Sequence, residues 1–288
     1  MAEPAPVPPA APRLGGALRG AAIDFYFNSW RLVPANLAWS AVLLAILALT
    51  AGVASLALLL LPLLALPTVG IYRLAVLITR GEPAALSDGF SAWRRFGAPA
   101  LGIGTALLAA GTMFGVNVGL GLLRGDVAGW SLATLAFWGL AVVAMAACVA
   151  WPILVDPRRE TLSTRARIRL ALLLIVAYPV RFAALAVVLG LVVAISTVGF
   201  AALLTISVSY VALVAARYVL PAADRLQARL EAPRHDGPSG GAVVRPHRGR
   251  GPRVEAPTEA TRSGQYHQLI PLHHPRVRVG MNRPPGRG

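Results

Sequence analysis

Charge is scarce in this sequence of 288 residues, of which 14% are charged and 56% are hydrophobic. A soluble domain carries about 25% charged residues, so the composition excludes an ordinary water-soluble enzyme. Lysine is absent, and the 27 basic residues are all arginines, which with 12 acidic residues give a net charge of +15. The single cysteine, Cys148, excludes a disulfide framework, a zinc cluster held by thiolates and an iron–sulfur centre.

Four long segments contain no charged residue: 32–72 with 41 residues, 96–123 with 28, 127–155 with 29 and 182–216 with 35. About 20 apolar residues cross the hydrocarbon core of a bilayer as a helix. The two longest segments exceed one crossing, so each is expected to form two helices with a turn between them. The sequence therefore predicts an all-α, polytopic transmembrane helical bundle of about six spans.

The turns are expected at 52–55 and 196–199, where small residues interrupt the apolar runs. The first run then has arms at about Ala35–Ala51 and Leu56–Thr79, and the last run has arms at about 180–195 and 199–219. Pro62, Pro67 and Gly70 predict a kink in the second arm. The alternative for the first run is one long helix followed by a surface segment at 68–79, which gives five spans.

The distribution of arginine favours six spans over five. With six spans, every arginine-rich loop lies on one side of the membrane, and the opposite loops together contain only Arg124 and Asp126 as charged residues. The positive-inside rule makes the arginine-rich side cytoplasmic. We therefore predict a multi-pass protein of the bacterial plasma membrane with both termini in the cytoplasm.

Three segments are expected along the chain: a disordered juxtamembrane segment at 1–30, the transmembrane domain at 31–222 and a basic disordered tail at 223–288. Residues 232–288 contain ten arginines, three acidic residues and all five histidines, and they have too little apolar surface to fold. Such a tail can hold anionic lipid headgroups, or it can lack a specific partner. Nucleic acid is not expected as a partner, because Tyr266 is the only aromatic residue of the tail and bases would have no stacking platform.

Two connecting stretches are expected to form short amphipathic helices on the cytoplasmic side. In 83–96, a helix capped by Ser87 places three aromatic residues on one stripe, namely Phe90, Trp93 and Phe96. Such a helix lies along the membrane surface or packs under the bundle. In 161–178, the uncharged part is too short to span, so we expect it to lie flat or against the next helix.

Small and polar residues inside the spans indicate helix packing. Gly111, Gly115 and Gly119 lie on one helix face, which lets a helix of the same chain or of a second copy approach closely. Asn117 is expected to point into the bundle and form a hydrogen bond. Arg73 is expected to extend toward the cytoplasmic surface, with contact to a substrate as the alternative.

The spans offer no set of residues for catalysis. They contain no histidine, and the acidic residues of this region lie in the loops between them. We therefore expect no enzymatic activity, no cofactor and no metal site. The lack of a carboxylate within the membrane also disfavours a proton-coupled transporter.

Several stretches of the chain resemble the YesL-like family of bacterial integral membrane proteins. The matching pieces are Asn36-Leu37-Ala38-Trp39, Leu66-Pro67-Thr68-Val69-Gly70-Ile71-Tyr72-Arg73, Asp88-Gly89-Phe90-Ser91-Ala92-Trp93-Arg94-Arg95-Phe96 and Ile168–Arg181. The resemblance covers about 28–220. It implies a non-enzymatic accessory to a transport system, in particular to a sugar importer of the ABC type.

One loop also resembles the coupling loop of ABC-importer permeases, which inserts a short helix into the ATPase. The resemblance rests on Ala84-Ala85-Leu86-Ser87-Asp88-Gly89 and the aromatic residues after it, but Pro83 replaces the expected glutamate. The alternative function is thus a permease subunit whose 83–96 loop docks an ATPase. Under either hypothesis the candidate docking residues are Asp88, Gly89, Trp93, Arg94 and Arg95.

Overall fold

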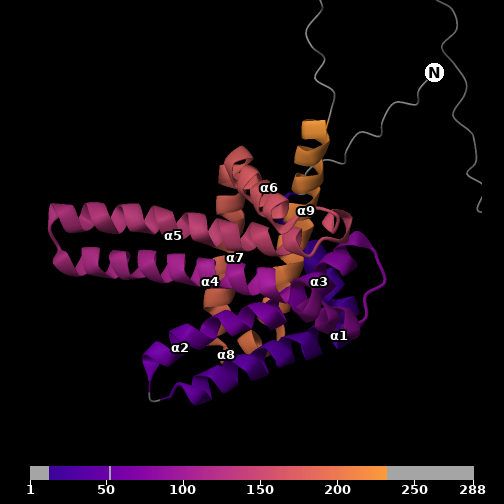
Figure 1. The fold of residues 1–288 in the computed structure, drawn as a ribbon, viewed down its shortest axis with the longest axis horizontal. Coiled ribbons are helices and arrows are strands. Elements are labelled where there is room, and N and C mark those ends of the chain that lie inside the picture. Colours follow the sequence, from indigo (N-terminus) through magenta and orange to yellow (C-terminus); the bar gives the residue numbers. More distant parts are fainter. Residues whose placement is uncertain (1–12, 52, 232–288) are drawn as a thin grey trace, which may run out of the picture. The chain divides into compact units, whose positions relative to one another are not determined.

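The computed structural model describes residues 13–51 and 53–231, which form helices and contain no strand. The elements are α1 (Leu14–Leu49), α2 (Ala54–Leu60), the 3-10 helix η1 (Leu61–Leu64), α3 (Ala65–Arg80), α4 (Leu86–Arg124), α5 (Val127–Leu154), the 3-10 helix η2 (Pro157–Arg159), α6 (Thr164–Ala177), α7 (Pro179–Val198), α8 (Phe200–Ala202), the π-helix η3 (Leu203–Ser207) and α9 (Val208–Glu231) (Figure 1). The predicted basic tail from 232 onward lies outside the described residues.

Six helical segments of the described chain are long and apolar enough to cross a membrane. They are Leu14–Leu49, Leu56–Arg80, Leu86–Arg124, Val127–Leu154, Pro179–Val198 and Phe200–Leu230. The predicted all-α bundle of about six spans is therefore confirmed, and the five-span alternative is not. The protein is a multi-pass membrane protein whose apolar helices are suited to lipid.

The interruptions that divide the long apolar runs lie where the sequence predicts them. The first helix ends at Leu49 and the next begins at Ala54, while α7 ends at Val198 with Gly199 after it. Pro62 lies within η1, where the backbone tightens to 3-10 geometry between α2 and α3. The regular helix is thus interrupted at Pro62, where proline removes a backbone donor, whereas Pro67 and Gly70 lie within the continuous helix α3.

Two predicted boundaries are wrong. Helix α1 begins at Leu14, so most of the expected disordered segment 1–30 is helical. Its first part is held by packing, since Ala17 and Ala21 are buried and Arg217 Nε lies 2.5 Å from Asp24 Oδ2. At the other end, α9 continues to Glu231 rather than ending near 222, because its apolar face stays packed as far as Ala223.

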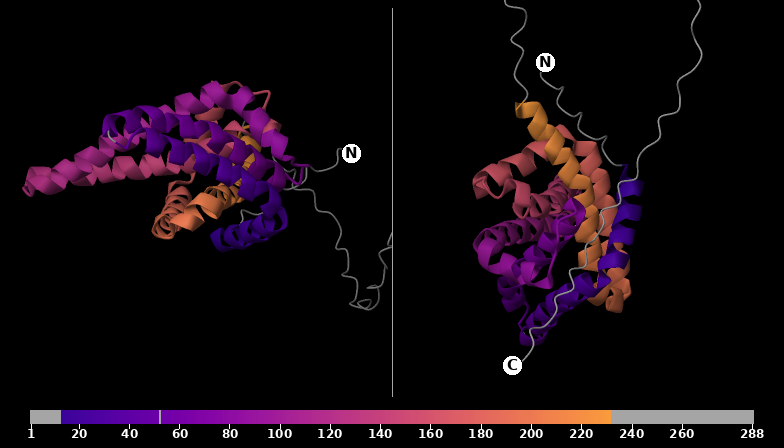
Figure 2. Two further views of the ribbon diagram at one scale, coloured as in Figure 1. Left: turned by 90° about the horizontal axis from the view of Figure 1, so that it is seen from below. Right: turned by 90° about the vertical axis from the view of Figure 1, so that its right-hand side faces the viewer.

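Helix α1 is bent within its length (Figure 2). Asn28 has non-helical dihedral angles, and its side-chain amide donates to Asp24 O at 2.9 Å. Pro34 follows and cannot donate a backbone hydrogen bond to the preceding turn. Before the bend, α1 meets α9 through the pairs Asp24–Arg217 and Leu18–Tyr210. After the bend, Asn36 contacts η3 and Ser209 of α9, and Trp39 donates to Thr68 of α3.

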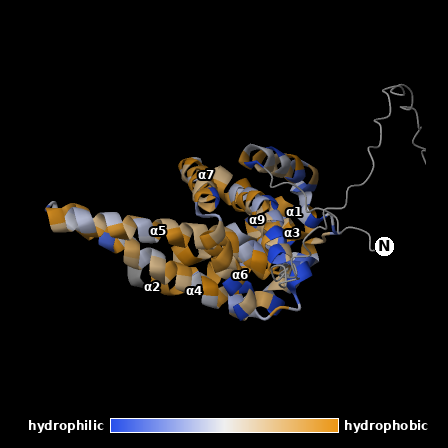
Figure 3. Ribbon diagram, turned by 90° about the horizontal axis from the view of Figure 1, so that it is seen from above, coloured by the Kyte–Doolittle hydropathy of each residue, from blue (hydrophilic) through white to orange (hydrophobic). Residues whose placement is uncertain are grey.

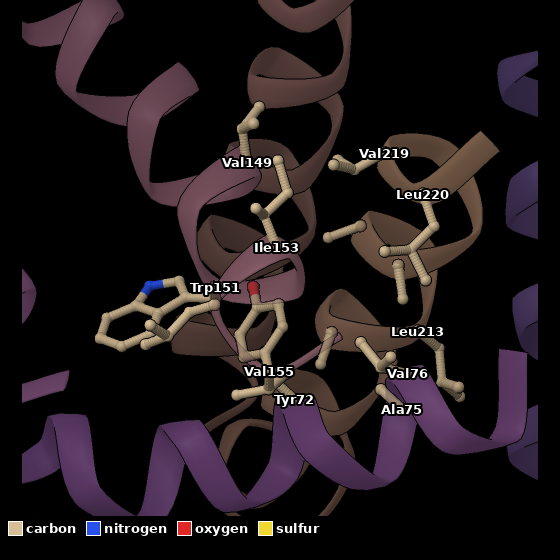
Figure 4. Close-up of a cluster of buried hydrophobic side chains, with 14 of the residues drawn as sticks. Tyr72, Ala75, Val76, Val149, Trp151, Ile153, Val155, Leu213, Val219 and Leu220 are labelled. Atoms are coloured by element: carbon tan, nitrogen blue, oxygen red, sulfur yellow. The ribbon is translucent and has the colours of Figure 1, made fainter. Parts of the chain in front are cut away.

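The core lies where α3, α5 and α9 meet (Figure 4). Helix α3 is the central element, since nearly all of its residues from Val69 to Leu77 are buried. The rings of Tyr72 and Trp151 stack with centroids 6.2 Å apart. Beside them, Leu213 and Val219 of α9 are fully buried.

Helices α4 and α5 form a long hairpin that extends beyond the other helices (Figures 1 and 2). Its turn is short because Gly125 adopts a left-handed conformation, with φ of 67°, and ends α4. Asp126 then begins α5 by accepting a hydrogen bond from Gly129 N at 2.6 Å. Hydrophilic residues instead gather near α3 and α6, at the other end of the hairpin (Figure 3).

Candidate functional site: the charged end of the bundle

Four charged side chains from three parts of the fold form a closed lattice at one end of the bundle. Arg80 is the last residue of α3, Asp156 and Arg159 lie in the connection between α5 and α6, and Asp224 belongs to α9. We call this group the charge lattice. Arg80 Nη2 lies 2.7 Å from Asp156 Oδ2, and Arg80 Nη1 lies 2.6 Å from Asp224 Oδ2. Arg159 contacts the same two carboxylates, with Nη2 2.6 Å from Asp224 Oδ1.

The charge lattice is mostly buried, and the side chains of Asp156 and Arg159 are 0% and 2% exposed. The exposed Arg158 adds a looser contact from outside, with Nη1 3.7 Å from Asp224 Oδ2. A buried charge is tolerated only when it is paired and hydrogen-bonded. Because each arginine joins both acids, the lattice ties α3 and α9 to the connection after α5.

A second charged group centres on Glu160, directly after the charge lattice residues of the same connection. Arg73 Nη1 lies 2.7 Å from Glu160 Oε1, and Arg95 Nη2 lies 2.6 Å from Glu160 Oε2. Arg73 also donates to Val155 O at 2.7 Å. Thus Arg73 reaches toward the charged end, as predicted, but it ends in an ion pair with a loop residue.

Arg167 of α6 is a buried cation that pairs with backbone rather than with a carboxylate. It donates to the carbonyl oxygens of Leu154 at 2.6 Å, Glu160 at 2.8 Å and Leu162 at 3.1 Å. Burial lowers the pKa of its guanidinium group, and the nearby carboxylate of Glu160 opposes this shift only in part. An arginine stays protonated in proteins, so Arg167 adds a positive charge that no carboxylate balances directly.

A buried amide joins α1 to the last span. Asn36 is fully buried, and its side-chain nitrogen donates to Leu203 O at 3.1 Å and to Leu204 O at 2.7 Å. Its side-chain oxygen accepts from Ser209 N at 3.0 Å. These backbone groups lie in and after the π-helix η3, whose wider hydrogen-bond spacing leaves groups for a side chain to satisfy. Asn36 therefore holds an irregular backbone inside the membrane domain.

Most of the predicted docking residues are used inside the chain. Asp88 Oδ2 accepts from Ala85 N at 2.7 Å and stabilises the first turn of α4. Gly89 lies against Gly70 and Leu74 of α3, and Trp93 packs over Gly70. Arg94 is exposed and has no ion-pair partner in the described part of the chain.

The expectation of a separate surface helix at 83–96 is wrong. Helix α4 begins at Leu86, with Ala85 rather than Ser87 as its N-cap, and continues to Arg124 without a break. Only part of the aromatic stripe faces the protein interior. Phe96 is 5% exposed, whereas Phe90 is 48% exposed. By contrast, 161–178 contains the separate helix α6, which packs mainly against the preceding helix α5 rather than against the next helix, where it was expected.

The glycine repeat is not used for packing within the described chain. A Cβ atom added at Gly111, Gly115 or Gly119 would meet nothing within 4 Å. The expectation that this face meets another helix of the same chain is therefore wrong. Asn117 is half-buried, and its side-chain amide donates to Met113 O of its own helix at 2.9 Å rather than to another helix.

The close helix contacts depend instead on single glycines. An added Cβ at Gly70 would lie 2.5 Å from Trp93 Nε1, and one at Gly121 would lie 2.5 Å from Gly129 O. One at Gly139 would lie 2.5 Å from the ring of Phe114. These glycines join α3 to α4 and α4 to α5, where side chains would keep the backbones apart.

The sequence analysis did not single out the charge lattice residues or Asn36 as a site. A usable signal was present, because Asp156-Pro157-Arg158-Arg159-Glu160 places four charges directly after a 29-residue uncharged run. Charges at such a position need partners from neighbouring helix ends. Their identity, however, depends on which helices become neighbours.

The fold and this site define a polytopic α-helical membrane protein whose charged residues tie its helices together at one end. No protein-family model, no curated protein and no solved structure matches the sequence.

Proposed function

We propose that the protein is a non-enzymatic accessory subunit of a transport system, and that it associates with its partner inside the membrane. The observation that carries the proposal is the open glycine face in the second half of α4, formed by Gly111, Gly115 and Gly119. Close helix association in lipid depends on such small-residue faces. A helix of another membrane protein therefore fits this face.

The charged end supports the same proposal. Its carboxylates are engaged by arginines of the chain, so they act as ties between helices. This arrangement suits a rigid support that holds a partner better than a carrier whose helices must separate. The positive-inside prediction gives this end to the cytoplasm of a bacterial cell. The resemblance to the YesL-like family points to an ABC importer, in particular one for sugars, as the transport system.

The alternative of a permease subunit has less support from the geometry. A coupling helix must protrude so that an ATPase can receive it. Here Gly89 and Trp93 pack against α3, and Asp88 stabilises the start of a full-length span. Docking of an ATPase is therefore the second candidate function. Substitution of the exposed Arg94 would test it, because this docking residue is not used inside the described chain.

The test is affinity purification of the full chain from its native membrane in mild detergent, with mass spectrometry of the co-purified proteins. We expect subunits of a transporter, and we expect Gly115→Leu to reduce their recovery at least fivefold. The control is Gly190→Leu in α7, because an added Cβ there also meets nothing within 4 Å. Equal recovery with both variants, or a purified protein without transporter subunits, would contradict the proposal.

A further inference from the structure

An apolar groove opens between α4, α5 and α6. It has a volume of about 480 Å³ and is lined by residues that include Pro99, Gly102 and Leu107 of α4, Ala146 of α5, and Ile168 and Leu172 of α6. The size lies within the range of about 300–1,000 Å³ typical of small-molecule sites. The residues from Pro99 to Leu107 extend about 12 Å along the helix axis, which is close to the depth of one hydrocarbon leaflet.

The groove is open on its α6 side. Ile168 and Leu172 remain 39% and 54% exposed, although they belong to the apolar face of α6. On α4, a Cβ atom added at Gly102 would meet nothing within 4 Å, so the groove continues to the backbone there. The surface thus has room for a flexible apolar chain.

Arginines lie at the end of the groove that is nearest to the charged end. Arg95 lies four residues before Pro99 and so on the same face of α4, one turn nearer to the helix start. Arg165 follows Thr164, which also lines the groove. The guanidinium carbon of Arg167 is 5.6 Å from the centroid of the Phe96 ring, which brings the start of α6 beside this turn of α4.

The mouth of the groove has an excess of positive charge. Arg73 and Arg95 share one carboxylate, that of Glu160. The neighbouring Arg167 forms no ion pair among the described residues and donates to carbonyl oxygens. Arg165 is exposed and has no hydrogen-bond or ion-pair partner within the described residues. A phosphate group placed here would meet arginines that no other anion fully neutralises.

We propose that this groove binds an anionic phospholipid, with an acyl chain between α4, α5 and α6 and the phosphate at Arg95 and Arg165. The apolar lining suits the chain, and the excess of arginine at one end suits a negatively charged headgroup. A second cavity lies between α2, η1 and α4 and is lined by residues that include Leu58, Pro62 and Met113. Its lining residues lie within the uncharged runs 32–72 and 96–123, so no arginine follows them closely along the chain.

The test uses the full-length protein in vesicles of phosphatidylcholine and phosphatidylglycerol, with a trace of phosphatidylglycerol that carries a photoreactive diazirine in its acyl chain. Mass spectrometry of the cross-linked peptides locates the label, which separates the groove from any binding elsewhere on the chain. We expect labelling of α4, α5 and α6 beside the groove. The same probe with a phosphatidylcholine headgroup should label these peptides at least fivefold less.

Two variants with matched controls test the two halves of the site. Gly102→Leu fills the groove, and Gly190→Leu adds the same side chain to an open position on α7. Arg95→Gln and Arg165→Gln together remove the phosphate contacts. Arg94→Gln removes the same charge about 100° around the helix. We expect at least fivefold less labelling with Gly102→Leu and with the double arginine variant, and less than twofold change with either control.

Three results would overturn the proposal. One is equal labelling of the groove by the two headgroups, which would make its contents ordinary bilayer lipid. Another is loss of labelling when glycerol 3-phosphate is added, which would assign the arginines to a soluble phosphate compound. The third is a cross-link between two copies through the groove peptides, which would make a second copy the occupant. The outcome does not depend on the proposed transport partner, because no partner is present in the vesicles.

Discussion

The charged end of the bundle and the far part of the α4–α5 hairpin, residues 111–139, are stabilised in different ways. At the charged end, ion pairs join α3, α9 and the connection after α5, and Asp156 has no exposed surface. In the far part, each helix of the hairpin packs mainly on the other. Large side chains such as Leu135 and Trp138 are 72% and 65% exposed there.

The difference separates two tasks within one membrane domain. Lipid cannot supply hydrogen bonds, so the charged end satisfies its polar groups with other parts of the chain. The far part presents apolar side chains and an open glycine face, both of which lipid or another helix can cover. Stability is therefore expected to depend on the first region, and association on the second.

The largest effect that would distinguish the two regions is expected from Asp156→Asn. The change leaves Arg80 and Arg159 without their shared buried carboxylate, and breaking a buried pair costs about 3–5 kcal/mol. The measurement is thermal unfolding in detergent, monitored through the reaction of a thiol-specific fluorophore with Cys148. This cysteine is the only one in the chain and is not fully exposed in the fold.

Asp126→Asn is the matched control at the tip of the hairpin. Asp126 pairs with Arg124 at 2.9 Å, but the two side chains are 49% and 63% exposed. Exposed pairs contribute up to about 1 kcal/mol, and asparagine keeps the ability to cap α5. A similar fall in the unfolding temperature for both variants would mean that the two ends do not differ as described.

A smaller effect is expected from Gly70→Ala at the contact of α3 with α4. The new methyl group would collide with Trp93 Nε1 and lie 2.8 Å from Gly89 O, and overpacking of this kind costs about 1–3 kcal/mol. Gly111→Ala makes the same change in the far part, where nothing lies within 4 Å. There we expect no loss, or a gain of about 0.5–1 kcal/mol from helix propensity, in the same unfolding assay. Destabilisation by Gly111→Ala would show that its face is covered.

The spans were predictable because the signals that define them are local. The length of each uncharged run, the small residues at 52–55 and 196–199, and Pro62 all act on their own stretch of chain. The failures at Leu14 and Glu231 concern helix ends that are held by contacts with distant helices. A sequence pattern gives the start of an apolar run, whereas packing decides how far the helix extends beyond it.

The residues that form the site were less predictable, because the residues that pair with one another there are far apart in sequence. Arg80 meets carboxylates 76 and 144 residues later, and Asn36 binds a carbonyl 167 residues later. The glycine repeat shows the same limit. Helix periodicity places Gly111, Gly115 and Gly119 on one face, but it does not say whether a helix of the chain lies opposite.

The smallest of the expected effects compares two asparagines of the spans. Asn36→Leu removes hydrogen bonds to the π-helix, and a hydrogen bond between membrane helices contributes about 1–2 kcal/mol in model peptides and less in whole proteins. We expect a loss of about 1–2 kcal/mol, measured as a lower unfolding temperature by reaction of Cys148.

The comparison becomes sharper with Asn117→Leu, which changes the same residue type in the far part of the hairpin. The side chain of Asn117 bonds only to its own helix, at Met113 O, among the described residues. Its removal is expected to leave the unfolding temperature unchanged or to raise it, because leucine is better suited to lipid and to a helix. If Asn117→Leu instead lowered the unfolding temperature while Asn36→Leu did not, the far part of the hairpin would contribute more to the stability of the fold than the contact of α1 with η3.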